Sequence, residues 1–109
     1  MEQQSFMKMR PKSVMVPAIF MQVSFNNTKK EQVIRVLLKD EKDIDKAKNL
    51  FLERYKKYDL EKVNNIALGI TYMGSPVIKL GYIDLSDEVE IDNTFLAIKL
   101  QYEDIVNQE

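Results

Sequence analysis

Apolar and polar residues alternate along two segments near the start of the chain, and this pattern most narrows the folds open to it. In the segment 14–25 the alternating apolar residues run from Ile19 to Phe25, and in the segment 32–39 they run from Ile34 to Leu38. Successive side chains of a β-strand point to opposite faces, so the alternation predicts two strands. The polar segment 26–30 between them predicts a turn. Pro17 has no N–H and is expected at an edge or a bulge of the first strand.

A helical period follows over the segment 43–58. One stripe of apolar residues recurs there at intervals of three or four positions: Ile44, Ala47, Phe51, Tyr55 and Tyr58. This spacing predicts an amphipathic helix with one face on the core. Asp43 is predicted as its N-cap, since a short acidic side chain accepts hydrogen bonds from the first free N–H groups of a helix.

The rest of the chain is predicted to be β-structure. Alternation predicts strands over 63–73, 77–85 and 94–102 and a short strand over 89–91, joined by turns, with 103–109 as a helical turn or a frayed end. The expected fold class is α+β: an antiparallel sheet in the order β-β-α-β-β-β-β with one amphipathic helix packed on one face. Residues 13–109 are predicted to form a single domain, and residues 1–12 a flexible N-terminal arm.

The chain of 109 residues contains neither cysteine nor histidine. These absences exclude disulfides, the usual zinc sites and catalysis by Ser-His or Cys-His pairs. Only three glycines occur and they lie far apart, so no phosphate-binding loop is expected. We therefore predict a protein that is not an enzyme and has no cofactor. No apolar run approaches the roughly 20 residues of a membrane span, and we expect a cytoplasmic protein, bacterial or phage in its composition, with no membrane partner.

Charge is divided unevenly between the two halves of the chain. Residues 1–62 hold 14 Lys and Arg against nine Asp and Glu, whereas residues 63–109 hold two against eight. Such a division can steer binding partners, and it can also pair the two halves within one fold or between copies.

The basic residues around the first predicted hairpin are candidates for contact with phosphates. The predicted nucleic-acid-binding residues are Lys29, Lys30, Arg35, Lys39, Lys62 and Asn64. An ordinary solvated hairpin is the alternative, because the sequence pI is about 5.6.

Five acidic residues gather between positions 84 and 92: Asp84, Asp87, Glu88, Glu90 and Asp92. They lack the glycine and the closing glutamate of an EF-hand loop, so we predict no metal site there. Three of them alternate along a predicted strand and could form an acidic edge that discourages strand pairing. Together with Phe20, which opposes the main apolar face of its strand, Glu88, Glu90 and Asp92 are the predicted partner-binding residues.

The segment 13–73 resembles in part the little finger domain of Y-family DNA polymerases of the UmuC/UvrX type. The resemblance rests on "IFMQVSF", "NNTKKE", "VIRVLLKDE", "DIDKAKNLFLERYKKY" and "KVNNIALGITYM", and "YIDLSDEVE" adds a short likeness. Asn64 and Asn65 stand where that family has an arginine. "GITYMGSPVIKLGYIDL" and "YEDIV" are similar to YolD-like proteins. The first resemblance implies a module that lies on a DNA backbone.

The sequence leaves three functions open. The first is a non-catalytic binding module associated with DNA or a DNA-processing complex. The second is a small protein–protein interaction or inhibitor protein that mimics nucleic acid or adds a strand to its partner. The third is a structural homo-oligomer. A protein partner or a second copy is expected, with a dimer as the expected assembly, and nucleic acid is the weaker expectation.

Overall fold

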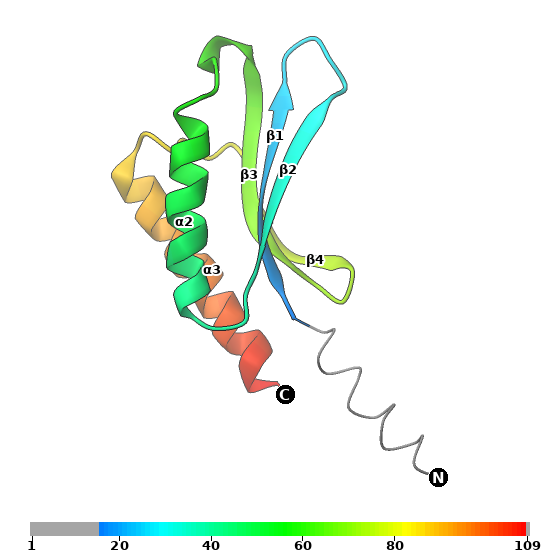
Figure 1. Ribbon diagram of the computed structural model, residues 1–109, viewed down its shortest axis with the longest axis vertical. Coiled ribbons are helices and arrows are strands. Elements are labelled where there is room, and N and C mark those ends of the chain that lie inside the picture. Colours follow the sequence, from blue (N-terminus) through cyan, green and yellow to red (C-terminus); the bar gives the residue numbers. More distant parts are fainter. Residues whose placement is uncertain (1–15, 109) are drawn as a thin grey trace.

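A computed structural model describes residues 16–108 (Figure 1). The elements are β1 (Ala18–Phe25), β2 (Glu31–Leu37), α2 (Lys42–Tyr55), the 3-10 turn η1 (Leu60–Lys62), β3 (Val63–Tyr72), β4 (Ser75–Leu80) and α3 (Glu88–Asn107). The predicted class is confirmed: the fold is α+β with an antiparallel sheet. The predicted arm over 1–12 lies outside the described residues.

The four strands form one sheet in the order β2-β1-β3-β4, and every neighbouring pair is antiparallel. The outer pairs β1–β2 and β3–β4 are local hairpins. The central pair β1–β3 joins distant parts of the chain, with Ala18 opposite Thr71. The turns predicted for these two hairpins are present, with Asn27 at φ 60° in the first and Met73 and Gly74 at φ 57° and 83° in the second. Two central residues with positive φ match the twist of a tight hairpin.

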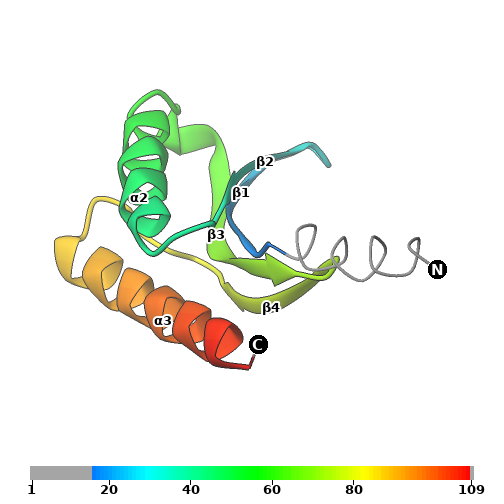
Figure 2. The same ribbon diagram turned by 60° about the horizontal axis from the view of Figure 1, so that its bottom comes forward.

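Both helices lie on the same face of the sheet (Figure 2). Alternate residues of β1 and β3 point toward them, as the alternation predicted, and meet the apolar stripes of the two helices. The buried core residues on this side are Ile19, Met21, Val23, Leu38, Ile44, Ala47, Phe51, Ile66, Leu68, Ile70, Leu85, Ile91, Phe95, Ile98, Tyr102 and Ile105. The amphipathic helix predicted over 43–58 is therefore α2, and it packs as expected.

The other face of the sheet carries no helix among residues 16–108, yet its centre is closed to solvent. Phe20 is only 4% exposed there, and it stands opposite Gly69 on β3. A Cβ atom at Gly69 would lie 2.8 Å from the Phe20 ring and would collide with the carbonyl oxygen of Ile78. Gly69 thus lets the ring and the backbone of β4 approach β3 closely.

Two local predictions are wrong. Pro17 precedes β1, which is a central strand, and its carbonyl accepts the N–H of Leu38 at 2.8 Å. The N-cap of α2 is Glu41, whose side chain makes no capping bond. Asp43 lies inside the first turn, and its carboxylate accepts the N–H groups of Lys39 (2.8 Å) and Asp40 (3.1 Å) instead. It fixes the chain that enters the helix.

The last third of the chain departs most from the prediction. The segments predicted as strands over 89–91 and 94–102 belong to one helix, α3, which also includes most of the tail. The predicted strand over 77–85 is shorter, since β4 ends at Leu80 and a loop follows. Asp87 caps α3 by accepting the N–H groups of Val89 and Glu90. Residues 16–108 therefore form a four-stranded sheet and two α-helices, in place of the six strands and one helix predicted. Neither α2 nor α3 has the length and apolar character that a membrane crossing requires.

Candidate functional site

Strand β2 is an outer strand of the sheet, with β1 on one side (Figure 1). Its pairing with β1 is continuous over seven residues, from Ala18 opposite Leu37 to Ser24 opposite Glu31, without a bulge. It contains no proline. Val33 and Leu37 are 41% and 54% exposed, which is high for such apolar residues in a strand. A long, regular and partly apolar edge is a template for the addition of another strand.

One hydrogen bond shows which backbone groups of β2 face away from the sheet. Leu38 donates its N–H to Pro17, so this pair bonds across the β1–β2 ladder. In an antiparallel pair, bonded and non-bonded positions alternate. The odd-numbered residues of β2 therefore point their N–H and C=O groups outward: Glu31, Val33, Arg35 and Leu37. Because Arg35 stands opposite Phe20, these side chains share the helix-free face. We call this row of four residues the β2 edge.

Strand β4 forms the opposite edge and is built differently. It has six residues and carries Pro76 opposite Thr71. Its pairing with β3 shifts register between Ile70 and Thr71. A proline removes a donor, and a bulge bends the edge, so both features hinder strand addition.

The predicted nucleic-acid-binding residues divide into three places. The β1–β2 turn is tied to η1 by two hydrogen bonds from Asn26. Its backbone N–H donates to the carbonyl oxygen of Lys62 (2.8 Å), and its side-chain amide donates to the carbonyl oxygen of Glu61 (3.0 Å). This brings Lys29, Lys30, Lys62 and Asn64 to one end of the sheet, which we call the basic end.

Arg35 lies instead in the middle of β2, and Lys39 follows that strand at its far end. The seven residues of β2, which rise about 3.3 Å each, lie between Lys30 and Lys39. Acidic residues also accompany the basic end: Glu31 begins β2, Asp59 caps η1 and Glu61 lies within it. The six predicted residues thus form no continuous basic surface. Asn65, next to Asn64, has a structural contact, since its side chain accepts the N–H of Tyr82.

The predicted partner-binding acids lie in the first two turns of α3, not on a strand. Their arrangement as an acidic strand edge is therefore wrong. Glu90 accepts the N–H of Asp84 at 2.8 Å and holds the loop before the helix. Asp92 pairs with Lys48 of α2 at 3.3 Å. Glu88 is exposed, whereas Phe20 is buried against Gly69 and offers little surface to a partner.

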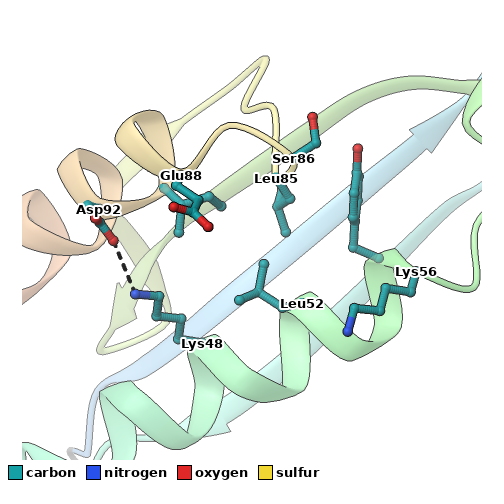
Figure 3. Close-up of a pocket in the computed structure, with 9 residues that line it drawn as sticks. Lys48, Leu52, Lys56, Leu85, Ser86, Glu88 and Asp92 are labelled. Carbon is teal, nitrogen blue, oxygen red and sulfur yellow. Dashed lines mark hydrogen bonds and ion pairs between the residues drawn. The ribbon is translucent and has the colours of Figure 1, made fainter.

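A groove of about 510 Å³ runs between α2 and the start of α3 (Figure 3). Lys48 of α2 points toward Asp92 of α3, and Lys56, which follows α2, lies on the other side of the apolar side chain of Leu52. The Lys48–Asp92 ion pair links the two walls, and Lys56 pairs with Glu53 at 3.8 Å. The first pair joins α2 to α3, whereas the second lies at the C-terminal end of α2.

The loop before α3 holds the carboxyl group of Asp84 in two hydrogen bonds. Ser86 donates its hydroxyl (2.6 Å) and its backbone N–H (2.9 Å) to Asp84. These bonds hold the pKa of the Asp84 carboxyl below its ordinary value, because they favour the charged form. Within the described part of the chain, no three acidic side chains converge as a metal site would require.

Comparison of the chain with protein-family models, with curated proteins and with solved structures finds no match. The likeness to the polymerase little finger and to YolD-like proteins therefore stays a prediction. The feature that sequence reasoning missed is the β2 edge, apart from Arg35. Its signal was a strand without proline or glycine, but the sequence does not state which strands end a sheet.

Proposed function

We propose that this protein is a non-catalytic interaction module that binds a protein partner by strand addition at the β2 edge. The observation that carries the proposal is the contrast between two outer strands of a single sheet: β2 is regular, without proline or bulge, whereas β4 has both. Strand addition uses main-chain hydrogen bonds for affinity and alternate side chains for specificity. The exposed side chains of Val33 and Leu37 would supply apolar contact beside the row of free backbone groups.

Amide exchange measured by NMR on the full ¹⁵N-labelled chain tests this proposal. At low concentration the N–H groups of Val33, Arg35 and Leu37 should exchange quickly, while those of Ile34 and Val36, which bond to β1, should exchange slowly. Complex formation should slow the first set selectively. Slow exchange of both sets in the isolated chain would contradict the outward assignment on which the proposal rests.

A capture experiment with matched variants gives a second test. Val33→Pro removes an outward N–H but no bond to β1, so the chain should fold and lose its partner. Leu96→Ser removes an apolar side chain that is exposed on α3, far from the β2 edge, and should retain the partner. Captured chains are identified by mass spectrometry, so that copies of this chain and other proteins are counted separately. Equal capture by Val33→Pro and the unmodified protein would refute strand addition.

Nucleic-acid binding at the basic end is the second candidate function. The favouring observation is that the two Asn26 hydrogen bonds bring Lys29, Lys30 and Lys62 together with Asn64. It ranks second because Glu31, Asp59 and Glu61 offset the three lysines locally. Single-stranded and duplex oligonucleotides, titrated at several salt concentrations, test it: a Lys29→Ala/Lys30→Ala/Lys62→Ala variant should bind more weakly, with a reduced salt slope. Lys46→Ala, on the exposed side of α2, is the control.

A further inference from the structure

We propose that the strand added at the β2 edge is β2 of a second copy of this chain, paired antiparallel across a two-fold axis with Val33 opposite Val33 of the partner subunit. The proposal rests on the proposed function and names its partner. Two four-stranded sheets would then join into one continuous sheet. Such an isologous contact uses the same surface on both copies and therefore closes at a dimer.

Only the odd-numbered residues of β2 point their N–H and C=O groups outward, and this limits the registers in which two copies of β2 can pair. Residues that exchange two hydrogen bonds must both point outward, so an odd-numbered residue of one copy has to stand opposite an odd-numbered residue of the other. For extensive overlap of the two strands, the two-fold axis can pass near Val33, Ile34 or Arg35. These three registers place different side chains opposite one another.

The side chains of the β2 edge select one of these registers. An axis at Arg35 sets two arginines opposite each other, and like charges in direct opposition are destabilising. An axis at Ile34 sets Glu31 opposite Leu37 and Val33 opposite Arg35, which pairs charged groups with apolar ones. An axis at Val33 sets Glu31 opposite Arg35 of the partner subunit and, by symmetry, Arg35 opposite Glu31 of the partner subunit. Two opposite-charge pairs then flank one apolar pair.

This charge complementarity is the reason to assign the partner as the same chain. Glu31 and Arg35 are both exposed, and each lies two residues from Val33. A strand that carries an acid and a base at equal distances from a central apolar residue is complementary to its own antiparallel copy. The apolar side chain at the centre is itself half-exposed in the single chain and would be covered in the dimer.

Substitutions that reverse the charges of Glu31 and Arg35 test both the dimer and its register. Sedimentation equilibrium over a wide concentration range should show a reversible dimer for the unmodified protein. Glu31→Arg and Arg35→Glu should each weaken it about tenfold, because each creates two like-charge pairs. The double variant Glu31→Arg/Arg35→Glu should restore the original dissociation constant. Lys79→Glu, a charge reversal on β4 at the opposite edge, should leave it unchanged.

Several outcomes would overturn the proposal. A monomer at every concentration would refute the second copy as partner, and a double variant as weak as the single ones would refute the Val33 register. A change as large with Lys79→Glu would show that association depends on overall charge rather than on β2. Circular dichroism of each variant verifies folding, since both exchanged side chains are exposed.

The proposed function can survive these failures, which keeps the two ideas distinguishable. A monomeric chain that captures another protein, and loses it with Val33→Pro, would remove the second copy but support strand addition. A dimer that persists unchanged in Val33→Pro would overturn both, because association would then use a different surface.

Discussion

Strands β2 and β4 end the same sheet, and they differ in how each edge meets solvent. β4 is short, carries Pro76 and pairs with β3 through a register shift, whereas β2 is longer, regular and free of proline. Edges in natural proteins are usually protected by proline, bulges or charge. A chain that protects one edge and leaves the other regular has an asymmetry that strand addition would explain. The predictions below test this contrast, from the largest expected effect to the smallest.

Gly69→Ala should give the largest loss of stability, because it disrupts the pairing of β4 with β3. The added Cβ would collide with the Ile78 carbonyl oxygen and press on the Phe20 ring, so both the β3–β4 pairing and the helix-free face would have to shift. We expect a loss of about 3 kcal/mol in the free energy of unfolding, measured by urea titration.

Gly81→Ala is the matched control for that substitution. A Cβ at Gly81 would lie 3.6 Å from the side chain of Asn65, an ordinary contact distance. Its effect should stay within about 0.5 kcal/mol. Equal losses in the free energy of unfolding for the two variants would show that the close approach of β4 to β3 is not the reason for glycine at position 69.

The alternation of backbone groups on β2 predicts a difference between two neighbouring prolines. Gln32→Pro removes an N–H directed at β1, while Val33→Pro removes one directed outward. The first variant should be less stable than the second by about 2 kcal/mol, since it leaves a buried acceptor without its donor. Thermal and urea unfolding of the two variants measure the difference. If Val33→Pro were the less stable variant, the assignment of the odd-numbered N–H groups of β2 as outward-facing would be wrong.

Pro76→Thr should make the β4 edge more like the β2 edge. The substitution returns a backbone donor, but the bulge at Ile70 and Thr71 still bends the strand. In a Val33→Pro background, we expect self-association to rise by about threefold or less, because a bent edge pairs poorly. Sedimentation equilibrium measures this gain. A gain as large as the loss caused by Val33→Pro would show that proline alone accounts for the difference between the edges.

Ser86→Ala should have the smallest effect, in the loop that follows β4. The pKa of Asp84 should rise toward its ordinary value, because the strongest hydrogen bond to its carboxylate is removed. A lowered pKa contributes stability above the unfolded-state pKa, near pH 4, and this contribution is lost as the pH falls through the folded-state pKa. The variant should therefore differ from the unmodified protein at neutral pH and converge with it in acid. NMR titration of the Asp84 carboxyl measures the shift.

The first two thirds of the fold could be predicted from the sequence because each segment there has one clear period. Two alternating strands lie within residues 18–37, on either side of a polar turn, and the stripe of α2 recurs at helical spacing. The turn at Met73 and Gly74 was marked by its glycine. Local pattern and tertiary burial agree in these segments, so little information beyond the sequence was needed.

The last third could not be predicted because it carries two periods at once. Leu96, Ile98, Leu100 and Tyr102 alternate like a strand, but the buried residues Ile91, Phe95, Ile98, Tyr102 and Ile105 recur like a helix. Leu96 and Leu100 prove to be exposed. Asp87 followed by Glu90, with no glycine or proline up to the last residue of α3, was the signal that favoured a helix.

The candidate site was harder to predict than the fold. The sequence identified Arg35 as charged and accessible, but it assigned the residue to a phosphate-binding group that the structure spreads along the whole strand. The property that sets β2 apart is its place at the end of the sheet. That place depends on the pairing of β1 with β3, which residue patterns within a single segment do not encode.

The central pairing of β1 with β3 also has a consequence for the kinetics of folding. Ala18 and Thr71 are 53 residues apart, whereas both outer hairpins close over a few residues. Short hairpins form within microseconds, but a contact across half the chain must first close a long loop. The joining of the two hairpins is then the slow step, and substitutions at Met21 or Leu68 should mainly slow refolding. Until that step is complete, each hairpin exposes the inner edge that its partner will later cover.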